Sequence, residues 1–549
     1  MAITDGPSDS FNHVWVTVTK IAFHTDPNAI WSASDATWQS TTLPSPVTID
    51  LAALNNGLMN NVFGKMNLPV GTYRQIRFFF DSDTDPLDSS AQAIMDNEAS
   101  PAALQWNDQV EYVNAAGAIA EAPLEIAYPV QGVQLQGSFS VTQGGTIDLA
   151  TDFDLDKIVV PYRSGTMQAF TMKPDLSYFD LSNSGGITGN VDASKLCSAA
   201  SWPTSAPFTP PAGCAFNLVV HAEAVSADGS RYQDMRSTTV KPDGTFTLAP
   251  LAVKDSSGNP ISYDIVIRGR QMQTLVVTGV KPGGTYSGTG LSSPTALQAA
   301  ANPLPIATVT EYGSQLAAPL SPLTSGHVIF EQTPQGGLPH EVRWADTDPL
   351  TGKLGRQGLA PWNQEFWLAS SGLNMAAYSA GGLTFAPATI AEGNGNYSVI
   401  ANETVYYNFG TPVSLLTPLP ITNAATFTPA APTLQSGVQN GTVGGTIAIS
   451  SIGNYTEGEV VLARFAHIIS AQPFSLTANT TPTFSISGVG ANVPGAYYYA
   501  YVRLDNCTGT IPGTTPTNTK CSHKIVPING AIDLRTTTTA TGMNVSLAL

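Results

Sequence analysis

Charged side chains are scarce in this chain. Asp, Glu, Lys and Arg together supply 11% of its 549 residues, whereas roughly 25% is usual for a soluble domain. The hydrophobic fraction of 42% is ordinary and excludes an intrinsically disordered chain. Ser, Thr, Asn, Gln and Gly must therefore cover most of the surface, as in many secreted β-proteins and in proteins that pack against copies of themselves.

Basic residues are the scarcer charged class, with 23 Lys and Arg against 40 Asp and Glu, and the net charge is −17. Because this charge repels phosphate groups, we expect no nucleic-acid partner. No apolar run approaches the roughly 18 residues that span a bilayer, so no transmembrane segment is expected. The opening residues, MAITDGPSD, also lack the basic and apolar regions of a signal peptide. We expect that an export signal has been removed.

Cysteine is rare, and its four copies form two local pairs, Cys197 with Cys214 and Cys507 with Cys521. The even number and the Pro- and Thr-rich segments between the partners favour two disulfides and an oxidising compartment. The alternative is four free thiols in a cytosolic protein. A zinc site is disfavoured because neither pair has Cys-x-x-Cys spacing.

Reactive constellations are missing as well. The seven histidines form no His-x-x-x-His or His-Glu-x-x-His motif, and no glycine-rich loop has phosphate-binding spacing. The segment AYSAG around Ser379 approximates a nucleophile elbow, but an apparent strand follows it where the elbow requires a helix. We therefore predict a protein that is not an enzyme.

The strongest positive signal is the alternation typical of β-strands. Val47, Ile49 and Leu51 alternate with polar residues, which is the period-2 pattern of a half-buried strand. A turn at 68–71 separates them from the bulky run at 73–80, whose Tyr, Ile and Phe favour β-structure. These patterns recur along the chain and predict an all-β fold of tandem β-sandwich domains, Ig-like or transthyretin-like, with few short helices.

A degenerate repeat supports a multidomain plan. Three segments share a Phe-centred strand, a turn-rich gap and a Tyr-centred strand, although any β-rich chain can produce such pairs by coincidence. The anchor pairs are Phe246 with Tyr263, Phe385 with Tyr397, and Phe484 with Tyr498. The predicted units are a first β-domain at 1–186, a sandwich at 187–290, an Ala-, Pro- and Ser-rich linker at 291–322, a sandwich at 323–430 and a C-terminal sandwich at 436–549.

Several motifs of the first domain resemble one known family. They are ITDGPSDSFNHVWVTVTKIAF, VTIDLAALNNG, LPVGTYRQIRFFF, SFSVTQGGTIDLATDFDLDK and GGITGNV. Over residues 1–190 the chain is similar to a bacterial envelope-lipoprotein family that is catalogued as a domain of unknown function. The resemblance implies an exported, often lipid-anchored β-domain without an established activity. The lipidated cysteine expected before such a domain is absent from this sequence, so a lipid anchor is an inference.

The following unit resembles a second family. The segments KPDGTFTLAPL (241–251) and YDIVIRG (263–269) are similar to transthyretin-like or carboxypeptidase-regulatory modules. That resemblance implies a small seven-stranded sandwich.

An acidic loop is the best candidate for a metal site. Asp81, Asp83, Asp85 and Asp88 place carboxylates close together in sequence, and such oxygen ligands suit a hard cation such as calcium. The loop is not an EF-hand, because Pro86 stands where that motif requires glycine. The alternative is a solvated acidic turn. No other cofactor is expected.

Aromatic residues give a candidate glycan site. Trp344, Trp362 and Trp367 lie in one turn-rich segment, 343–367, together with Asp and Asn residues. Exposed aromatic rings beside such polar groups can stack on sugars. The alternative is that these tryptophans fill the space between two sheets.

Two functions are therefore open for a protein at the extracellular or outer-membrane surface of a bacterium. The first is a non-catalytic structural or adhesive role, with self-assembly into a fibre or layer through edge strands. The alternative is a surface glycan-binding protein. For the first role, the Thr-rich C-terminal run, 535–549, could add as a strand to a neighbouring molecule or could complete its own sheet.

Overall fold

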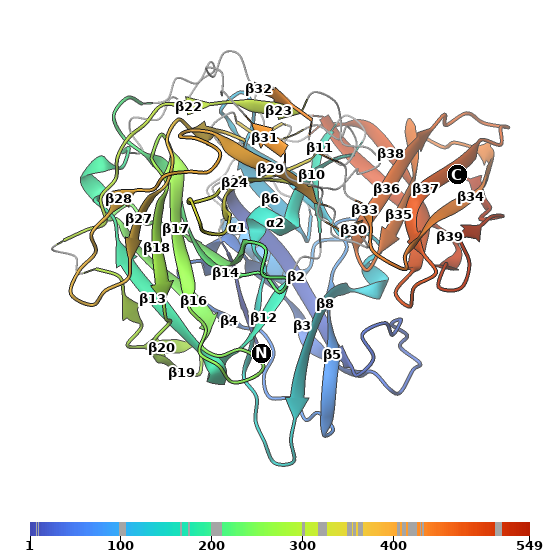
Figure 1. Cartoon of the computed structure of the whole chain (residues 1–549). Coiled ribbons are helices and arrows are strands. Elements are labelled where there is room, and N and C mark those ends of the chain that lie inside the picture. Colours follow the sequence, from blue (N-terminus) through green and yellow to red (C-terminus); the bar gives the residue numbers. More distant parts are fainter. Residues whose placement is uncertain are drawn as a thin grey trace.

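The computed structural model is built almost entirely from β-strands, shown in Figure 1. Its α-helices in the described residues are α1 (Ser89–Asn97) and α2 (Leu155–Ile158), and its 3-10 helices there are η1 (Ala52–Leu54), η2 (Pro129–Gln131), η3 (Leu181–Asn183) and η4 (Ala193–Lys195). The structure describes all residues except 7, 9, 98–105, 165–166, 174–175, 199–210, 299–301, 317–326, 348–353, 355–357, 361–365, 403–406, 409–412, 416–424, 429, 431–432 and 511–518. The prediction of an all-β fold of tandem β-sandwiches with few short helices is confirmed.

The first sandwich is organised around one long strand, β2 (Phe11–His24), whose Val14, Val16 and Val18 are buried in its core. The first half of this strand pairs with β6 and its second half pairs with β5, while β3 runs along it. The larger sheet contains β10 (Val159–Ser164), β11 (Met167–Met172), β7 (Ile119–Glu125), β6 (Gln109–Val113), β2, β5 (Gly71–Phe80), β8 (Val133–Val141) and β3 (Gln39–Asp50). The smaller sheet contains β12 (Ser177–Asp180), β9 (Leu149–Asp152), β1 (Ala2–Thr4) and β4 (Asn60–Asn61).

The second sandwich packs a three-stranded sheet against a six-stranded sheet. The smaller sheet contains β16 (Thr245–Ala252), β13 (Ser184–Asn190) and β21 (Thr295–Ala296). The larger sheet contains β15 (Tyr232–Thr239), β14 (Phe216–Val225), β17 (Tyr263–Arg270), β18 (Leu275–Val280), β27 (Asn374–Ala377) and β28 (Ala386–Pro387). Its core also contains Leu304 and Ile306, which the sequence places in a linker.

Strands β27 and β28 come from the middle of the segment predicted to form a separate sandwich, 323–430. Instead, β27 pairs in parallel with β18, and Phe385 packs against the core of the second sandwich. This pairing satisfies the backbone groups along the outer edge of β18, and it partly buries an apolar ring. Residues 374–387 thus complete the second sandwich.

A third sheet covers the opposite face of the six-stranded sheet. It contains β25 (His340–Asp346), β24 (His327–Gln332), β29 (Tyr397–Asn402) and β31 (Val413–Leu415). Val266 and Val276 of the six-stranded sheet share a core with Val328 and Phe330 of the third sheet. All eight residues of β17 are buried as a result.

Short strand pairs complete this part of the molecule. They are β19 (Thr285–Ser287) with β20 (Gly290–Ser292), β22 (Glu311–Tyr312) with β26 (Leu368–Ala369), β23 (Ser314–Leu316) with β32 (Ala425–Phe427), and β30 (Tyr407–Asn408) with β33 (Thr433–Leu434).

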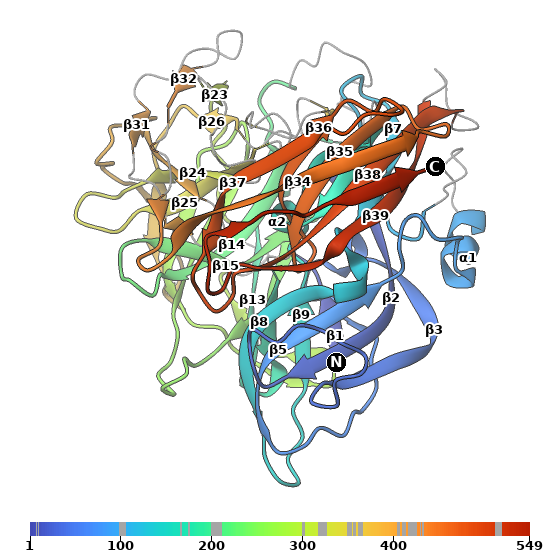
Figure 2. The ribbon, with the colours of Figure 1, turned by 90° about the vertical axis from the view of Figure 1, so that its right-hand side faces the viewer.

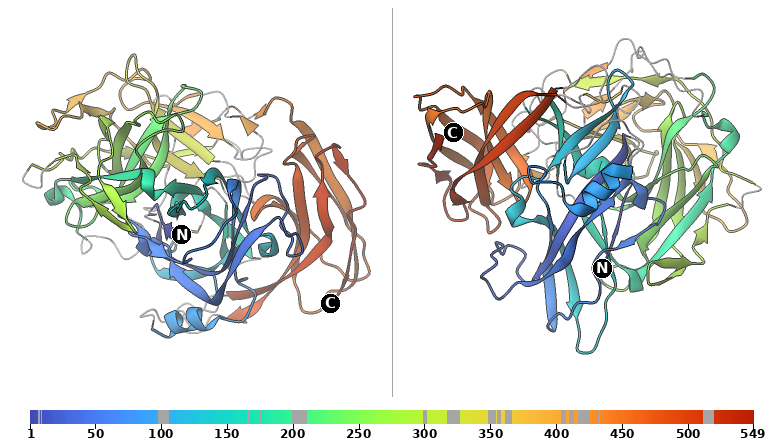
Figure 3. Two further views of the ribbon diagram at one scale, coloured as in Figure 1. Left: turned by 90° about the horizontal axis from the view of Figure 1, so that it is seen from below. Right: turned by 180° about the vertical axis from the view of Figure 1, so that it is seen from behind.

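The C-terminal sandwich has its own core and lies beside the first sandwich, as Figures 2 and 3 show. One sheet contains β37 (Thr483–Ala491), β34 (Gln439–Ser451), β40 (Thr539–Ala540) and β41 (Val545–Ala548). The other contains β36 (His467–Phe474), β35 (Glu457–Arg464), β38 (Tyr497–Thr510) and β39 (Thr519–Asp533). In the described part of the chain, no helix is long and apolar enough to cross a membrane.

A disulfide joins Cys197 to Cys214, just before β14. Cys507 on β38 is also disulfide-bonded, but the side chain of its predicted partner, Cys521, lies outside the described residues. The described cysteines include no free thiol.

We expect a peptide that links Cys197 to Cys214 in a non-reduced digest of the native protein, identified by mass spectrometry. Replacing both with serine should lower the free energy of unfolding by about 3 kcal/mol, because the bond closes a loop of roughly 15 residues. Alkylation of both thiols in the native protein would contradict the bond and the argument for an oxidising compartment.

Candidate functional site

The junction between the first and C-terminal sandwiches is built by one strand with two different faces. On β38, Tyr498, Ala500, Val502 and Leu504 point into the C-terminal core. The alternate residues Tyr499, Tyr501, Arg503 and Asp505 are buried as well, because the first sandwich covers them. Tyr501 packs with Ala127 and Tyr162 of that sandwich, and the ring centroids of Tyr499 and Tyr128 are 4.7 Å apart.

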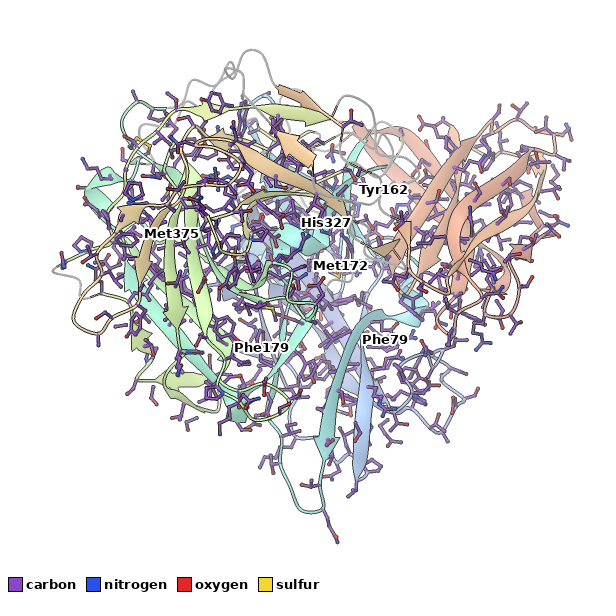
Figure 4. The ribbon with its side chains drawn as sticks, viewed as in Figure 1. Phe79, Tyr162, Met172, Phe179, His327 and Met375 are labelled. Atoms are coloured by element: carbon purple, nitrogen blue, oxygen red, sulfur yellow. A yellow bond between two sulfur atoms is a disulfide. The ribbon has the colours of Figure 1, made fainter. Side chains whose placement is uncertain are left out.

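Arg503 is the charged centre of this junction. Its guanidinium lies 3.0 Å from Glu125 of the first sandwich and 3.4 Å from both Glu459 and Asp505 of its own sandwich. The hydroxyl of Tyr162 donates a hydrogen bond to Glu459. Figure 4 shows Tyr162 on the side of the first sandwich that faces the C-terminal one.

Carboxyl groups outnumber cations at this junction. Burial raises the pKa of Glu125 to about 8 and that of Asp83 to about 7, although the charge of Arg503 opposes both shifts. The pKa of Glu459 is raised by burial as well. Burial and Arg503 hold the pKa of His523, 3.6 Å from Asp83, well below its usual range. The junction therefore retains carboxyl protons near neutral pH.

A second buried network joins the first sandwich to the six-stranded sheet. Lys157, on α2, has its ammonium 2.7 Å from Asp234 and 3.2 Å from Asp154. Arg236 forms an ion pair with Asp152 and donates a hydrogen bond of 2.9 Å to the hydroxyl of Thr4. Burial lowers the pKa of Lys157, but the two carboxylates outweigh this and raise it well above its usual range. Lys157 therefore stays protonated near neutral pH and holds the two carboxylates together, whereas a general base would have to be unprotonated.

The same pattern continues towards the third sheet. Arg231 pairs with Glu331 at 2.9 Å, and His340 lies 2.9 Å from Glu223. Arg343 donates to the backbone oxygen of Gly269 on β17 at 2.5 Å. These contacts tie side chains from separate sheets together, which is a structural role.

The predicted calcium ligands have separate surroundings. Asp83 is buried at the junction beside His523, while Asp88 accepts two 2.8 Å hydrogen bonds from the backbone N–H and hydroxyl of Ser90 at the start of α1. Asp81 is half-buried and Asp85 is exposed. Among the described residues, no three His, Cys, Asp or Glu side chains are grouped so as to hold a metal ion.

Of the predicted glycan-binding tryptophans, the structure describes Trp344 and Trp367, and neither ring is fully exposed. Trp344 is 7% exposed and its ring lies 4.5 Å from that of His327, so it is closed to a sugar. Trp367 is half-buried, with the guanidinium of Arg270 over its ring at 4.9 Å. Trp362 lies outside the described residues. Glycan binding stays a hypothesis.

Sequence reasoning did not find the junction residues. A signal was present in YYYAYVRLD (497–505), where aromatic and charged residues occupy one face of a strand and apolar residues the other. Such a two-sided strand predicts a covered sheet, but the partner that covers it comes from residues more than 300 positions away.

Comparison with known proteins adds one family assignment for part of the chain. Residues 1–174 match the model described as "Domain of unknown function (DUF4382)". This supports the resemblance of the N-terminal part to a domain of unknown function and does not address a lipid anchor or the transthyretin-like modules. No curated protein matches the chain.

Several solved structures show weak similarity. The fimbrial protein FimP from Actonomyces oris is 9% identical, with 67% of this chain and 98% of that chain covered and a TM-score of 0.12. The pilus adhesin SpaC from Lactobacillus rhamnosus GG is 12% identical, with 70% of this chain and 45% of that chain covered and a TM-score of 0.13. The major pilin SpaA of Corynebacterium diphtheriae is 10% identical, with 66% of this chain and 99% of that chain covered and a TM-score of 0.10. TM-scores this low carry no argument about function.

We expect the thermal stability of the protein to be the same with calcium and with a chelator, because Asp83 and Asp88 already have other partners. The measurement is a pair of melting curves on the full chain. A lower melting temperature in chelator, restored by added calcium, would show instead that the acidic loop binds the ion.

The pH dependence of stability should report on Glu125. A carboxyl whose pKa is raised on folding contributes stability that is complete below the unfolded pKa, near 4.3, and is lost as the pH rises through the folded pKa. Between these values, up to about pH 8, Glu125 should lower the free energy of unfolding by about 1.4 kcal/mol per pH unit.

The Glu125→Gln variant should remove this contribution, since glutamine is uncharged at every pH. Denaturant titrations at pH 6 and pH 8 provide the measurement. The matched control is Glu457→Gln, at an exposed position of β35. This variant should keep the wild-type change in the free energy of unfolding between pH 6 and pH 8. If the free energy of unfolding changed equally with pH in both variants, Glu125 would not be protonated at the junction.

Proposed function

We propose that this protein is a non-catalytic structural or adhesive component of the bacterial cell surface, which associates with copies of itself through its C-terminal sandwich. The observation that carries the proposal is the contrast between the edge strand β3 of the first sandwich and the edge strand β37 of the C-terminal sandwich. Isolated β-proteins protect such edges with lysine, proline, bulges or covering elements.

The edge of the first sandwich at β3 is protected. Strand β3 contains Pro44 and Pro46, which cannot donate backbone hydrogen bonds. Helix α1 packs beside this strand, and the backbone N–H of Thr48 donates to the hydroxyl of Ser90 on the helix at 3.1 Å. Another chain would find few free backbone groups here.

The C-terminal sandwich has a different edge at β37. This nine-residue strand contains neither a charged residue nor proline, and it alternates exposed Thr483 and Ser485 with buried Phe484 and Ile486. Within it, the N–H of Ser485 donates to the side chain of Gln472 at 3.2 Å. The strand has a bulge at Gly488, and its first half, Thr483–Ile486, has the uncharged, regular character that favours pairing with a further strand.

The last strand of the chain is a candidate for exchange between molecules. Strand β41 pairs in parallel with β34 of its own sheet, which agrees with the simpler of the two alternatives for the C-terminal run. Of its four residues only Leu547 is buried, while Ser546 and Ala548 are exposed. Buried Leu547 and partly buried Val545 hold this short strand against the core. Because so few side chains hold it, the same strand of a neighbouring molecule can take its place.

The disulfide between Cys197 and Cys214 supports the extracellular part of the proposal, because such bonds persist in oxidising compartments. The buried ion pairs support the structural part. They connect the sheets into one unit that can transmit load, since breaking a buried pair by removing one partner costs about 3–5 kcal/mol.

The proposal predicts opposite effects for two neighbouring substitutions in β41. Leu547→Asp places a charge in the core position and should prevent association, whereas Ser546→Asp changes an exposed position and should leave it intact. Light scattering after size-exclusion chromatography and electron microscopy of the full chain provide the readouts.

Circular dichroism checks that both variants are folded. A folded Leu547→Asp protein that associates like the wild type would exclude exchange of the last strand. A wild-type protein that stays monomeric at every concentration would contradict self-association altogether.

A further inference from the structure

A cavity of about 670 Å³ opens at one end of the first sandwich, between its two sheets. In Figure 1 this is the lower end of the molecule, where β5 and β8 extend. The volume lies within the range of about 300–1,000 Å³ that is typical of ligand pockets. Its floor consists of the buried side chains of Phe23, Phe63, Phe139, Leu149 and Leu181.

The aromatic floor is held in place by ring contacts. Phe139 packs edge-on against Phe23 at 5.8 Å between ring centroids and stacks on Tyr73 at 5.4 Å. The hydroxyl of Tyr73 donates to the backbone oxygen of Pro69 at 3.0 Å, which connects this cluster to the loop that forms one wall. These contacts fix the positions of the rings that form the floor of the cavity.

Apolar and polar residues divide the cavity into an interior and a mouth. The walls carry half-buried Met66, Leu68, Val141 and Ile147, and the rim carries exposed polar residues such as Lys65, Asn67, Thr142 and Asp148. The interior is therefore apolar and only the opening is polar.

The lining restricts the chemistry of a ligand. None of the lining residues, all of which the structure describes, has a buried side-chain polar atom that lacks a partner. A sugar or nucleotide placed here would lose hydrogen bonds to water and find no side-chain partner in the interior, which is unfavourable. A hydrocarbon chain loses no hydrogen bonds and gains apolar contact with the Phe, Leu, Met and Ile side chains.

We propose that this cavity binds the hydrocarbon chain of an amphiphile, with the polar head group at the rim near Lys65. The site lies in the first sandwich and is independent of the association proposed for the C-terminal one. Its ligand class is a fatty acyl chain, supplied either as a free fatty acid or by a membrane lipid.

The test is a titration of the full chain with cis-parinaric acid, a fatty acid whose fluorescence rises in apolar surroundings. We expect saturable binding. Two variants address the cavity, Leu68→Trp, which fills it, and Ile147→Glu, which places a charge in its wall. Each should weaken binding at least tenfold. The matched control is Ile119→Glu, at a position that is 61% exposed and outside the cavity, which should bind like the wild type.

A competition experiment needs no variant. Palmitate should displace the bound probe, and maltose should not. Displacement by phosphatidylglycerol vesicles as well as by palmitate would indicate a membrane lipid as the source, whereas displacement by palmitate alone would indicate a free fatty acid. The proposal is overturned if the wild type shows no saturable binding, if maltose displaces the probe, or if a folded cavity variant binds as tightly as the control.

Discussion

The buried charge of Arg503 determines how the C-terminal sandwich sits on the rest of the molecule. Taking a guanidinium out of water costs several kcal/mol unless its partners are in place. Arg503 finds Glu459 and Asp505 in its own sandwich, but its 3.0 Å partner, Glu125, belongs to the first. The full set of partners exists only in one relative orientation of the two sandwiches. An apolar contact alone would tolerate sliding, because hydrophobic attraction is not directional.

The same constraint acts where the first sandwich meets the six-stranded sheet. Lys157 and Arg236 are held by Asp234, Asp154 and Asp152, and these residues come from both sides of the contact. Removing Asp152 would leave the buried Arg236 without its ion-pair partner, and removing Asp234 or Asp154 would leave Lys157 with one carboxylate in place of two. Either loss is more costly than losing an exposed pair. The tandem sandwiches are therefore units of one assembly, unlike modules joined by free linkers.

Local patterns in the sequence predicted the strands well and their partners less well. The alternation in β37 and β38 is visible in the sequence, and the anchors Phe484 and Tyr498 do share one core. Phe246 and Tyr263 also share a core, but Phe385 packs in the second sandwich while Tyr397 belongs to the third sheet. Periodicity reports which face of a strand is buried. It does not report which sheet the strand joins, because an open edge accepts any strand of suitable register.

The candidate sites were harder to predict for a related reason. The short sequence spacing of Asp83 and Asp88 indicated a shared cation, yet Asp83 points into a junction formed with His523, more than 400 residues away. Likewise, the segment YDIVIRGR of β17 has the sequence pattern of an apolar strand that contains a few charged residues. Its charged residues are buried because the third sheet covers the outer face of β17. Among them, Arg270 pairs with Glu311 at 2.9 Å. Long-range contacts decide these environments, and a local motif contains no information about them.

Because basic residues are scarce, those that are buried in the interior are not available to protect the edge strands. At least eight of the 23 Lys and Arg residues are buried, among them Arg77, Arg236 and Arg503. Lysine on an edge strand is a common guard against pairing with another chain, and a chain that places its few cations inside has fewer left for that purpose. Neither β37 nor β41 contains a charged residue. The ion pairs that fix the sandwiches to one another therefore leave few cations for the outer strands, and β37 and β41 have no charge protection. Uncharged outer strands favour the proposed exchange between molecules.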